Sequence, residues 1–236
     1  MNSSNQSRRH FLRAATMTLA GSHLGPFSAA AARPAPAPPA TGNRSATGVP
    51  ASFGRLKQID AGVLSVGYAE EGPAAGPPVI LLHGWPYDIH SYAEPAALLA
   101  AQGYRVIVPY LRGYGTTRFR SEGAFRNGQQ SALAVDVIHL MDALGIDKAI
   151  LAGFDWGART AVITAALWPE RCKALVSVSG YLIGSREANR MPLPPAAEYQ
   201  WWYQYYFATE RGRAGYERYR RDFARLIWRN NSPGWD

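Results

Sequence analysis

The sequence contains one cysteine, Cys172, in 236 residues. A single thiol can form neither an internal disulfide nor a cysteine-based metal cluster, so both are excluded within this chain. Acidic residues are absent before Asp60, whereas seven of the 25 Lys and Arg residues lie there. From Asp60 onward the chain has 18 basic and 17 acidic residues. This near balance gives no electrostatic case for binding nucleic acid.

Long hydrophobic runs are also missing, and no run after the first fifty residues is long enough to cross a bilayer. The N-terminus has basic residues in "SRRHFLR" (Ser7–Arg13), then a mildly apolar stretch, then the small residues of Ser28–Ala32. This order is typical of an export signal. The paired arginines resemble a twin-arginine signal, which predicts that residues 1–32 direct the protein to a bacterial periplasm or out of the cell. A mitochondrial transit peptide is the alternative, because it is also rich in Arg and Ser.

The rest of the chain divides into three parts by composition. Residues 33–52 are rich in Pro and Ala and predict a flexible linker. Residues 53–184 alternate between apolar strand patterns and helical patterns, which predicts an open, mostly parallel sheet with helices on both faces. Expected strands are 62–70, 77–84, 104–110, 148–154 and 172–180; expected helices are 91–103, 128–145 and 157–169. Residues 185–236 are aromatic and charged with helical spacing, which predicts a helical cap over the site.

One stretch has the outline of a nucleophile elbow. "GFDWG" (Gly153–Gly157) follows a predicted strand and opens a predicted helix, and its glycines allow a tight turn that projects the central side chain. Asp155 stands where such turns usually have serine. The alternative is that Asp155 only caps the helix that follows it.

Several motifs in one order extend this pattern. "HGWP" (His83–Pro86), "RGYG" (Arg112–Gly115), "GFDWGA" and "YQYYF" (Tyr203–Phe207) resemble those of the α/β-hydrolase superfamily, in the branch of epoxide hydrolases and haloalkane dehalogenases. The resemblance covers the chain from about Phe53 onward. It implies an α/β-hydrolase fold, a mostly parallel sheet with helices on both faces and a helical cap.

The resemblance also implies a mechanism centred on Asp155. A carboxylate suits attack on a saturated carbon that has a strained or good leaving group, which forms an alkyl ester of the enzyme. Water then cleaves this ester, and backbone N–H groups hold the oxyanion. The resemblance assigns these donors to the backbone amides of Trp85 and Trp156, and it places His83 and Gly84 with Trp85 in the oxyanion loop. Packing in the pocket wall is the alternative for both tryptophans.

The leaving group decides between the two enzyme types. An epoxide needs an acid that protonates the departing oxygen, whereas a halide needs only weak N–H donors. By resemblance the ring-opening acid is Tyr203, ahead of Tyr205 and Tyr206, and this favours an epoxide over an alkyl halide. Packing of an aromatic cap helix is the alternative for these tyrosines. The expected partner is therefore a small apolar electrophile, and no metal or organic cofactor is implied.

The family also uses a histidine base and an orienting carboxylate, both placed after the cap. None of the five histidines of this sequence holds that position. We therefore expect a chain truncated at its C-terminus, with the last strands of the sheet missing. A non-catalytic module is the alternative, for example a binding domain whose aromatic cap face meets a partner. Whether this chain turns over substrate by itself, and its oligomeric state, stay open.

Overall fold

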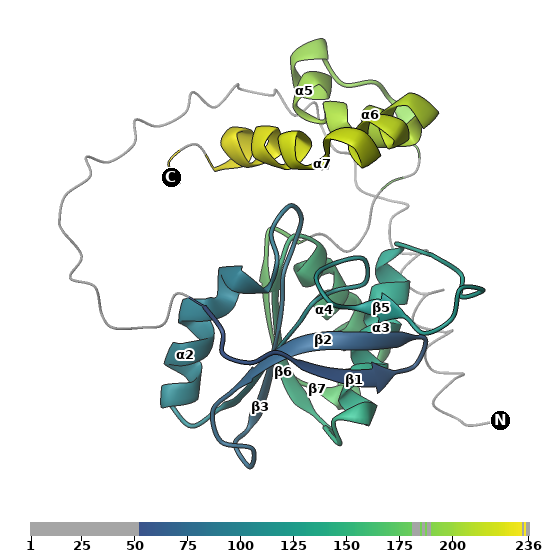
Figure 1. Cartoon of the computed structure of the whole chain (residues 1–236). Coiled ribbons are helices and arrows are strands. Elements are labelled where there is room, and N and C mark those ends of the chain that lie inside the picture. Colours follow the sequence, from purple (N-terminus) through teal and green to yellow (C-terminus); the bar gives the residue numbers. More distant parts are fainter. Residues whose placement is uncertain (1–51, 181–184, 186, 188–189, 233, 235–236) are drawn as a thin grey trace, which may run out of the picture. The chain divides into compact units, whose positions relative to one another are not determined.

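The computed structural model describes residues 52–180, 185, 187, 190–232 and 234 (Figure 1). The predicted signal, residues 1–32, and all but the last residue of the predicted linker, residues 33–52, lie outside them. The strands are β1 (Lys57–Ala61), β2 (Leu64–Glu71), β3 (Pro78–Leu82), β4 (Arg105–Pro109), β5 (Arg118–Phe119), β6 (Ala149–Phe154) and β7 (Cys172–Val178). The helices are η1 (Ile89–Tyr92), α2 (Ala93–Ala101), α3 (Gln130–Ala143), α4 (Trp156–Leu167), η2 (Pro169–Arg171), α5 (Pro195–Gln200), α6 (Trp202–Ala208) and α7 (Glu210–Asn231).

The strands form one mixed sheet in the order β1-β2-β4-β3-β6-β7, and β5 pairs with β2. β4, β3, β6 and β7 run parallel, whereas β1, β2 and β4 are joined by antiparallel pairing. The predicted, mostly parallel sheet is thus confirmed, and the sequence analysis missed β1 and β5. β3 pairs with β4 on one side and with β6 on the other, so the chain adds strands first to one side of β3 and later to the opposite side. Ligands bind at such a switch point, outside the carboxyl ends of the strands.

The inner parallel strands β3, β4 and β6 face two cores. Ile80 and Leu82 of β3 belong to one buried cluster, and the alternate residues Val79 and Leu81 belong to another. Since side chains alternate along a strand, the two clusters lie on opposite faces of the sheet. Helices α3 and α4 cover the first face and α2 covers the second, as Figure 1 shows. This confirms the prediction of helices on both faces.

The β7 edge of the sheet is apolar and exposed. Leu175, Val176 and Val178 are 39%, 53% and 54% exposed. Among the described residues, no strand pairs with the outer side of β7. β7 is therefore the edge strand of the described sheet.

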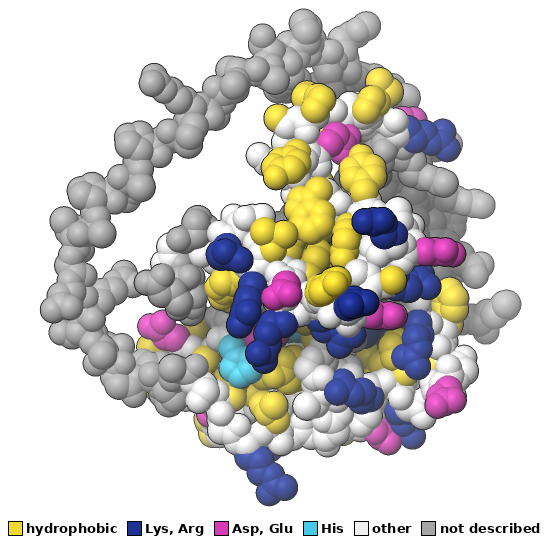
Figure 2. Space-filling view, turned by 45° about the horizontal axis from the view of Figure 1, so that its top comes forward, with side chains coloured by type: hydrophobic (Ala, Val, Ile, Leu, Met, Phe, Trp, Pro, Cys, Tyr) yellow, Lys and Arg dark blue, Asp and Glu magenta, His cyan; other side chains and the backbone are white. Residues whose placement is uncertain are grey.

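The segment after β7 is helical, as predicted. Its aromatic side chains pack around Phe223 of α7, whose ring lies 5.1–5.7 Å from four other rings; these belong to Trp202, Tyr206, Phe207 and Tyr216. Most of the aromatic cluster therefore holds α6 against α7. Figure 2 shows further hydrophobic side chains on one face of the molecule, interspersed with Lys and Arg. Within the described part of the chain, none of the helices has the length and apolar character to span a membrane.

Candidate active site

Asp155 stands in the turn that joins β6 to α4. Its backbone has φ 51° and ψ −117°, a region that residues other than glycine seldom adopt and that costs on the order of 1–3 kcal/mol. Its N–H donates to the carbonyl of Val178 at the end of β7, with a distance of 3.0 Å. The strained turn thus lies at the carboxyl ends of β6 and β7, as in a nucleophile elbow.

Two glycines let the surrounding backbone come close to this turn. A Cβ atom on Gly157 would lie 1.8 Å from the Leu82 carbonyl oxygen, so α4 contacts the end of β3 directly. A Cβ atom on Gly84 would lie 2.6 Å from the Asp155 Cβ atom. Both positions therefore need glycine for close approach, and the loop after β3 lies against the Asp155 side chain.

The Asp155 carboxylate is held from two sides. The backbone N–H of Trp85 donates to Oδ1 at 3.0 Å, and Arg159 Nη2 lies 3.4 Å from Oδ2. The side chain makes no capping bond to its own helix, so the alternative that Asp155 serves only as an N-cap is wrong. The side chain is 30% exposed, which leaves it within reach of a small molecule.

His83 is a buried part of the loop rather than a surface base. It is fully buried, its Nδ1 bonds the Gly84 carbonyl at 3.2 Å, and its Nε2 accepts from the Leu111 N–H at 3.2 Å. Burial lowers the pKa of the imidazole, which favours the neutral ring that these two bonds require. The ring thereby ties the loop after β3 to the end of β4.

The two tryptophans of the predicted oxyanion site occupy different places. Trp85 presents its backbone N–H to Asp155, while its ring faces the cap. Trp156 is the first residue of α4, where no intrahelical carbonyl is available to the backbone N–H. Trp156 also lines an open hollow of about 600 Å³. The other lining residues are Asn127, Gly128, Gln129, Gln130, Ser131 and Ile163. Asp155 is not among them, so the hollow adjoins the elbow rather than containing it.

Of the three candidate tyrosines, Tyr203, Tyr205 and Tyr206, only Tyr203 lies against the loop after β3. Its ring centroid is 4.4 Å from that of Trp85. Tyr205 is 59% exposed and its hydroxyl donates to Glu198 at 2.8 Å. Tyr206 stacks on Phe223 within the cap, at 5.5 Å. The structure therefore brings Tyr203 and Trp85 together, and it commits Tyr205 and Tyr206 to contacts inside the cap.

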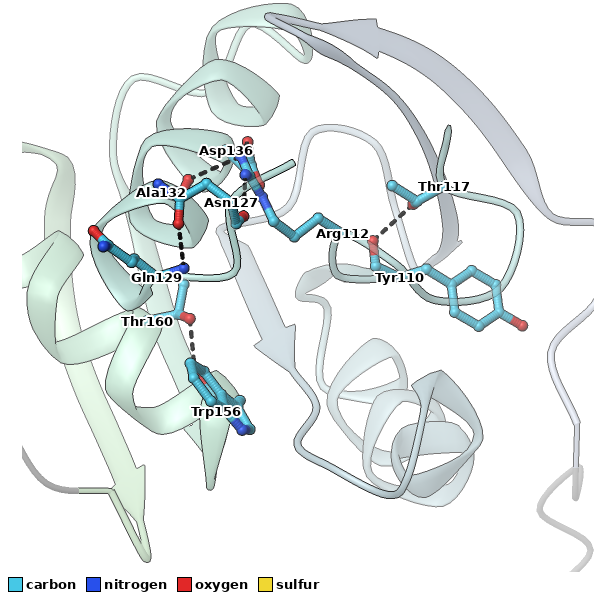
Figure 3. A network of polar contacts seen from close by, with 9 residues as sticks. All are labelled: Tyr110, Arg112, Thr117, Asn127, Gln129, Ala132, Asp136, Trp156 and Thr160. Atoms are coloured by element: carbon cyan, nitrogen blue, oxygen red, sulfur yellow. Dashed lines mark hydrogen bonds and ion pairs between the residues drawn. The ribbon is translucent and has the colours of Figure 1, made fainter. Parts of the chain in front are cut away.

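The loop after β4 is fixed by a largely buried ion pair that the sequence analysis missed (Figure 3). Arg112 donates to both carboxylate oxygens of Asp136 at 2.6 Å and to the Asn127 carbonyl at 2.5 Å. Burial raises the pKa of Asp136, and Arg112 opposes that shift. This bidentate pair fastens the loop to α3 beside the hollow that Trp156 lines.

Tyr114, in the same loop, also belongs to the neighbourhood of the elbow. Its ring packs edge-on against His83 with a centroid distance of 4.6 Å. Burial raises the pKa of the Tyr114 hydroxyl well above its ordinary value, and the negative charge of Asp155 adds to that rise. The "RGYG" motif was the signal in the sequence for this loop.

The remaining histidines lie away from these contacts. His10 and His23 are outside the described residues. His90 bonds Asp88 on the surface at 3.0 Å, and His139 is part of α3. In residues 52–180, 185, 187, 190–232 and 234, His, Cys, Asp and Glu side chains form no group of three that could hold a metal ion.

Residues 77–228 match the family model for the alpha/beta hydrolase fold. The chain belongs to that family. It is also similar to epoxide hydrolases. It is 35% identical to epoxide hydrolase B of Mycobacterium tuberculosis over 150 residues, which cover 58% of this chain and 41% of that protein.

Solved structures agree with this placement. A crystal structure of a candidate epoxide hydrolase from Klebsiella pneumoniae is 65% identical, with a TM-score of 0.73, and the match covers 77% of this chain and 60% of that one. An epoxide hydrolase from Vigna radiata is 30% identical with a TM-score of 0.50, and the match covers 60% of this chain and 41% of that one. The chain thus spans less than two thirds of the length of these relatives.

Proposed function

We propose that the protein is a hydrolase of the epoxide hydrolase type in which Asp155 is the nucleophile. The observation that carries this proposal is the carboxylate itself: a strained turn lifts it off its own helix, and the Trp85 N–H binds its Oδ1. This contact leaves Oδ2 as the attacking oxygen. The similarity to epoxide hydrolases supports an epoxide as the electrophile.

The first chemical step is then a displacement at carbon. Asp155 Oδ2 forms a bond to one epoxide carbon, the bond from that carbon to the epoxide oxygen breaks, and the electron pair stays on the oxygen. The product of this step is an alkyl ester of Asp155. The departing oxygen takes the hydroxyl proton of Tyr203, a cap residue whose ring lies beside that of Trp85.

The second step is hydrolysis of the ester. A base takes a proton from water, the water oxygen bonds to Asp155 Cγ, and the negative charge that develops on Oδ1 is held by the backbone N–H groups of Trp85 and Trp156. A preorganised donor of this kind contributes roughly 3–4 kcal/mol to the transition state. Trp85 already makes this contact with the free carboxylate.

The Cγ–Oδ2 bond then breaks, and Oδ2 leaves on the alkyl group, takes up a proton and becomes the second hydroxyl of a diol. Among the described residues, the hydrogen bonds to the Asp155 carboxylate come from Trp85 and Arg159 and none from a histidine, so we expect the ester to persist long enough to be detected.

Covalent labelling tests the nucleophile. The full chain is incubated with styrene oxide and digested, and the peptides are analysed by mass spectrometry for an added epoxide mass at residue 155. We expect label on the wild type and on Asp60→Asn, a control at an exposed carboxylate that pairs with Arg120. We expect none on Asp155→Asn. Label of equal extent on Asp155→Asn would refute the proposal; saturable binding without label would favour a binding module.

A second measurement tests the acid and the leaving group. Replacing Tyr203 by Phe removes the proton donor, so labelling by an epoxide slows by about 100- to 10,000-fold, whereas labelling by an alkyl iodide keeps its rate. Tyr205→Phe is the matched control, since its hydroxyl bonds Glu198 on the cap surface. Equal slowing with both reagents would show that Tyr203 only packs the site. An iodide preferred by the wild type would favour the dehalogenase alternative.

We also propose that residues 1–32 act as a twin-arginine export signal and that the protein works in the periplasm or outside the cell. The order of basic, apolar and small residues supports this proposal.

A further inference from the structure

Tyr203 is the residue of α6 that is turned towards the loop after β3. Trp202 and Tyr206, four residues apart, share one face of α6, and both rings pack on Phe223 of α7. Tyr203 follows Trp202 by one residue, so its side chain points about 100° away from that face. Its ring meets the Trp85 indole, with a centroid distance of 4.4 Å and an interplanar angle of 33°. The proposed acid thus has a direct contact with the loop that adjoins the nucleophile.

The helix that contains Tyr203 does not fix this ring by itself. α6 has seven residues, and its N-cap residue, Trp201, makes no side-chain capping bond. Helices this short are marginal in water and depend on tertiary packing. The Trp201 and Trp202 rings meet Tyr203 edge-on, with centroid distances of 6.0 Å and 6.5 Å. The Trp85 indole is closer and more nearly parallel, as in an offset-stacked aromatic pair.

The backbone of Trp85 binds the nucleophile. Its N–H donates to Asp155 Oδ1 at 3.0 Å. A Cβ atom on the preceding residue, Gly84, would lie 2.6 Å from the Asp155 Cβ atom, so the loop is already in contact with the turn. Trp85 therefore contacts both partners of the ring-opening step, the carboxylate through its backbone and the acid through its side chain.

Ring opening depends on the separation of these two partners. The carboxylate oxygen must reach an epoxide carbon while the acid proton reaches the epoxide oxygen. Reacting atoms must lie roughly 3–3.5 Å apart, and misplacement by about 1 Å costs about 100-fold in rate. A halide leaves as a stable anion and needs no proton, so its displacement depends on the nucleophile alone. A comparison of the two leaving groups therefore measures the position of the acid.

We infer that the Trp85 side chain is a positioning residue for the acid: the indole holds the Tyr203 hydroxyl at the epoxide oxygen while the backbone N–H of Trp85 orients Asp155. This inference rests on the proposed function, because it requires Asp155 as the nucleophile and Tyr203 as the acid. In the step concerned, the Asp155 Oδ2–carbon bond forms and the carbon–oxygen bond of the epoxide breaks. The epoxide oxygen takes the Tyr203 proton, and the tyrosinate regains a proton from solvent. Trp85 forms no bond to the substrate.

Two reagents of similar shape test the inference. Styrene oxide needs an acid, and (2-iodoethyl)benzene does not. The rate of Asp155 labelling by each is measured by peptide mass spectrometry on the full chain, and the epoxide rate is divided by the iodide rate. Trp85→Leu keeps the backbone donor and removes the indole, so it is expected to lower this ratio by about 100-fold. Trp85→Phe keeps a flat ring and is expected to restore a large part of the ratio.

A control variant removes a different ring of the cap. Tyr199 is 77% exposed, and Tyr199→Leu is expected to keep the wild-type ratio. The thermal unfolding midpoint of each variant shows whether it is folded. If Trp85→Leu is unfolded, Trp85→Met takes its place, because methionine fills more of the space and lacks a planar ring.

A double-mutant cycle shows whether Trp85 acts through Tyr203. In the Tyr203→Phe background the hydroxyl is already absent, so Trp85→Leu is expected to leave the ratio unchanged. A further fall as large as in the wild-type background would show that the indole acts on the substrate directly, and it overturns the inference.

The outcomes distinguish the inference from the proposed function. A ratio unchanged in Trp85→Leu, including equal slowing with both reagents, overturns the positioning role and leaves Asp155 and Tyr203 in theirs. A ratio that Tyr203→Phe does not lower removes Tyr203 as the acid, and the inference with it. A folded wild type without label at Asp155 from either reagent overturns the proposed function itself.

Discussion

Gly84 offers the sharpest test of the contact between the loop after β3 and the nucleophile. Its φ lies outside the left-handed region, so alanine is compatible with its backbone and the effect of Gly84→Ala is steric. The added Cβ would lie 2.6 Å from the Asp155 Cβ and 2.9 Å from Oδ1. Carbon atoms in contact are separated by roughly 3.5–4.0 Å, so the loop must move by about 1 Å.

That movement breaks the bond that orients the carboxylate. The Trp85 N–H to Oδ1 distance is 3.0 Å, and a shift of about 1 Å takes it beyond hydrogen-bonding range. Misplacement of this size in an active site costs about 100-fold in rate. The same overpacking lowers the free energy of unfolding by about 1–3 kcal/mol, which leaves a domain of ordinary stability folded.

The assay is the rate of Asp155 labelling by styrene oxide, together with urea unfolding followed by tryptophan fluorescence. Gly54→Ala is the matched control, because no atom lies within 4 Å of its added Cβ. It is expected to label at the wild-type rate. If Gly84→Ala is folded and labels as fast as the wild type, the Trp85 N–H does not position Asp155, and the geometric argument for the site fails.

Three further predictions concern other parts of the chain. Arg112→Met leaves the largely buried Asp136 without its bidentate partner and is expected to lower the free energy of unfolding in urea by about 3–5 kcal/mol. The double variant with Asp136→Leu is expected to lose less than the sum of the single changes, and additive losses would contradict this. Because the pKa of His83 is depressed below 6.5, the unfolded chain takes up a proton that the folded chain refuses, so stability falls as pH drops below about 6.5. The loss is at most about 1.4 kcal/mol per pH unit, and a folded His83→Gln variant with an unchanged pH slope would exclude this source. Replacing Arg8 and Arg9 by Lys is expected to keep the protein in the cytoplasm, and cell fractionation that finds it exported would contradict the twin-arginine assignment.

Local patterns predicted much of the fold and the elbow. The apolar runs of β3, β4 and β6 are typical of buried parallel strands, and the structure has all three where they were expected. Gly153 and Gly157 indicated a sharp turn, and Asp155 has the strained backbone of such a turn. These features depend on neighbours within a few residues, so the sequence contains them directly.

Contacts between distant segments could not be predicted in this way. Arg112 and Asp136 are 24 residues apart, and only the folded loop brings them together. The pairing of Tyr203 with Trp85 likewise depends on how the cap meets the sheet. The Asp155–Arg159 contact is different, because its four-residue spacing predicts a shared helix face. A search of the sequence for charged residues one helical turn after Asp155 would have identified this contact.

The most direct test of the account is the chemical nature of the bond at Asp155. The full chain labelled with an epoxide is treated with hydroxylamine, which cleaves esters, and the peptide that contains residue 155 is sequenced by mass spectrometry. The account predicts loss of the epoxide mass and a hydroxamate at Asp155. An adduct that resists hydroxylamine, or one that maps to Cys172 or to a histidine, would contradict it.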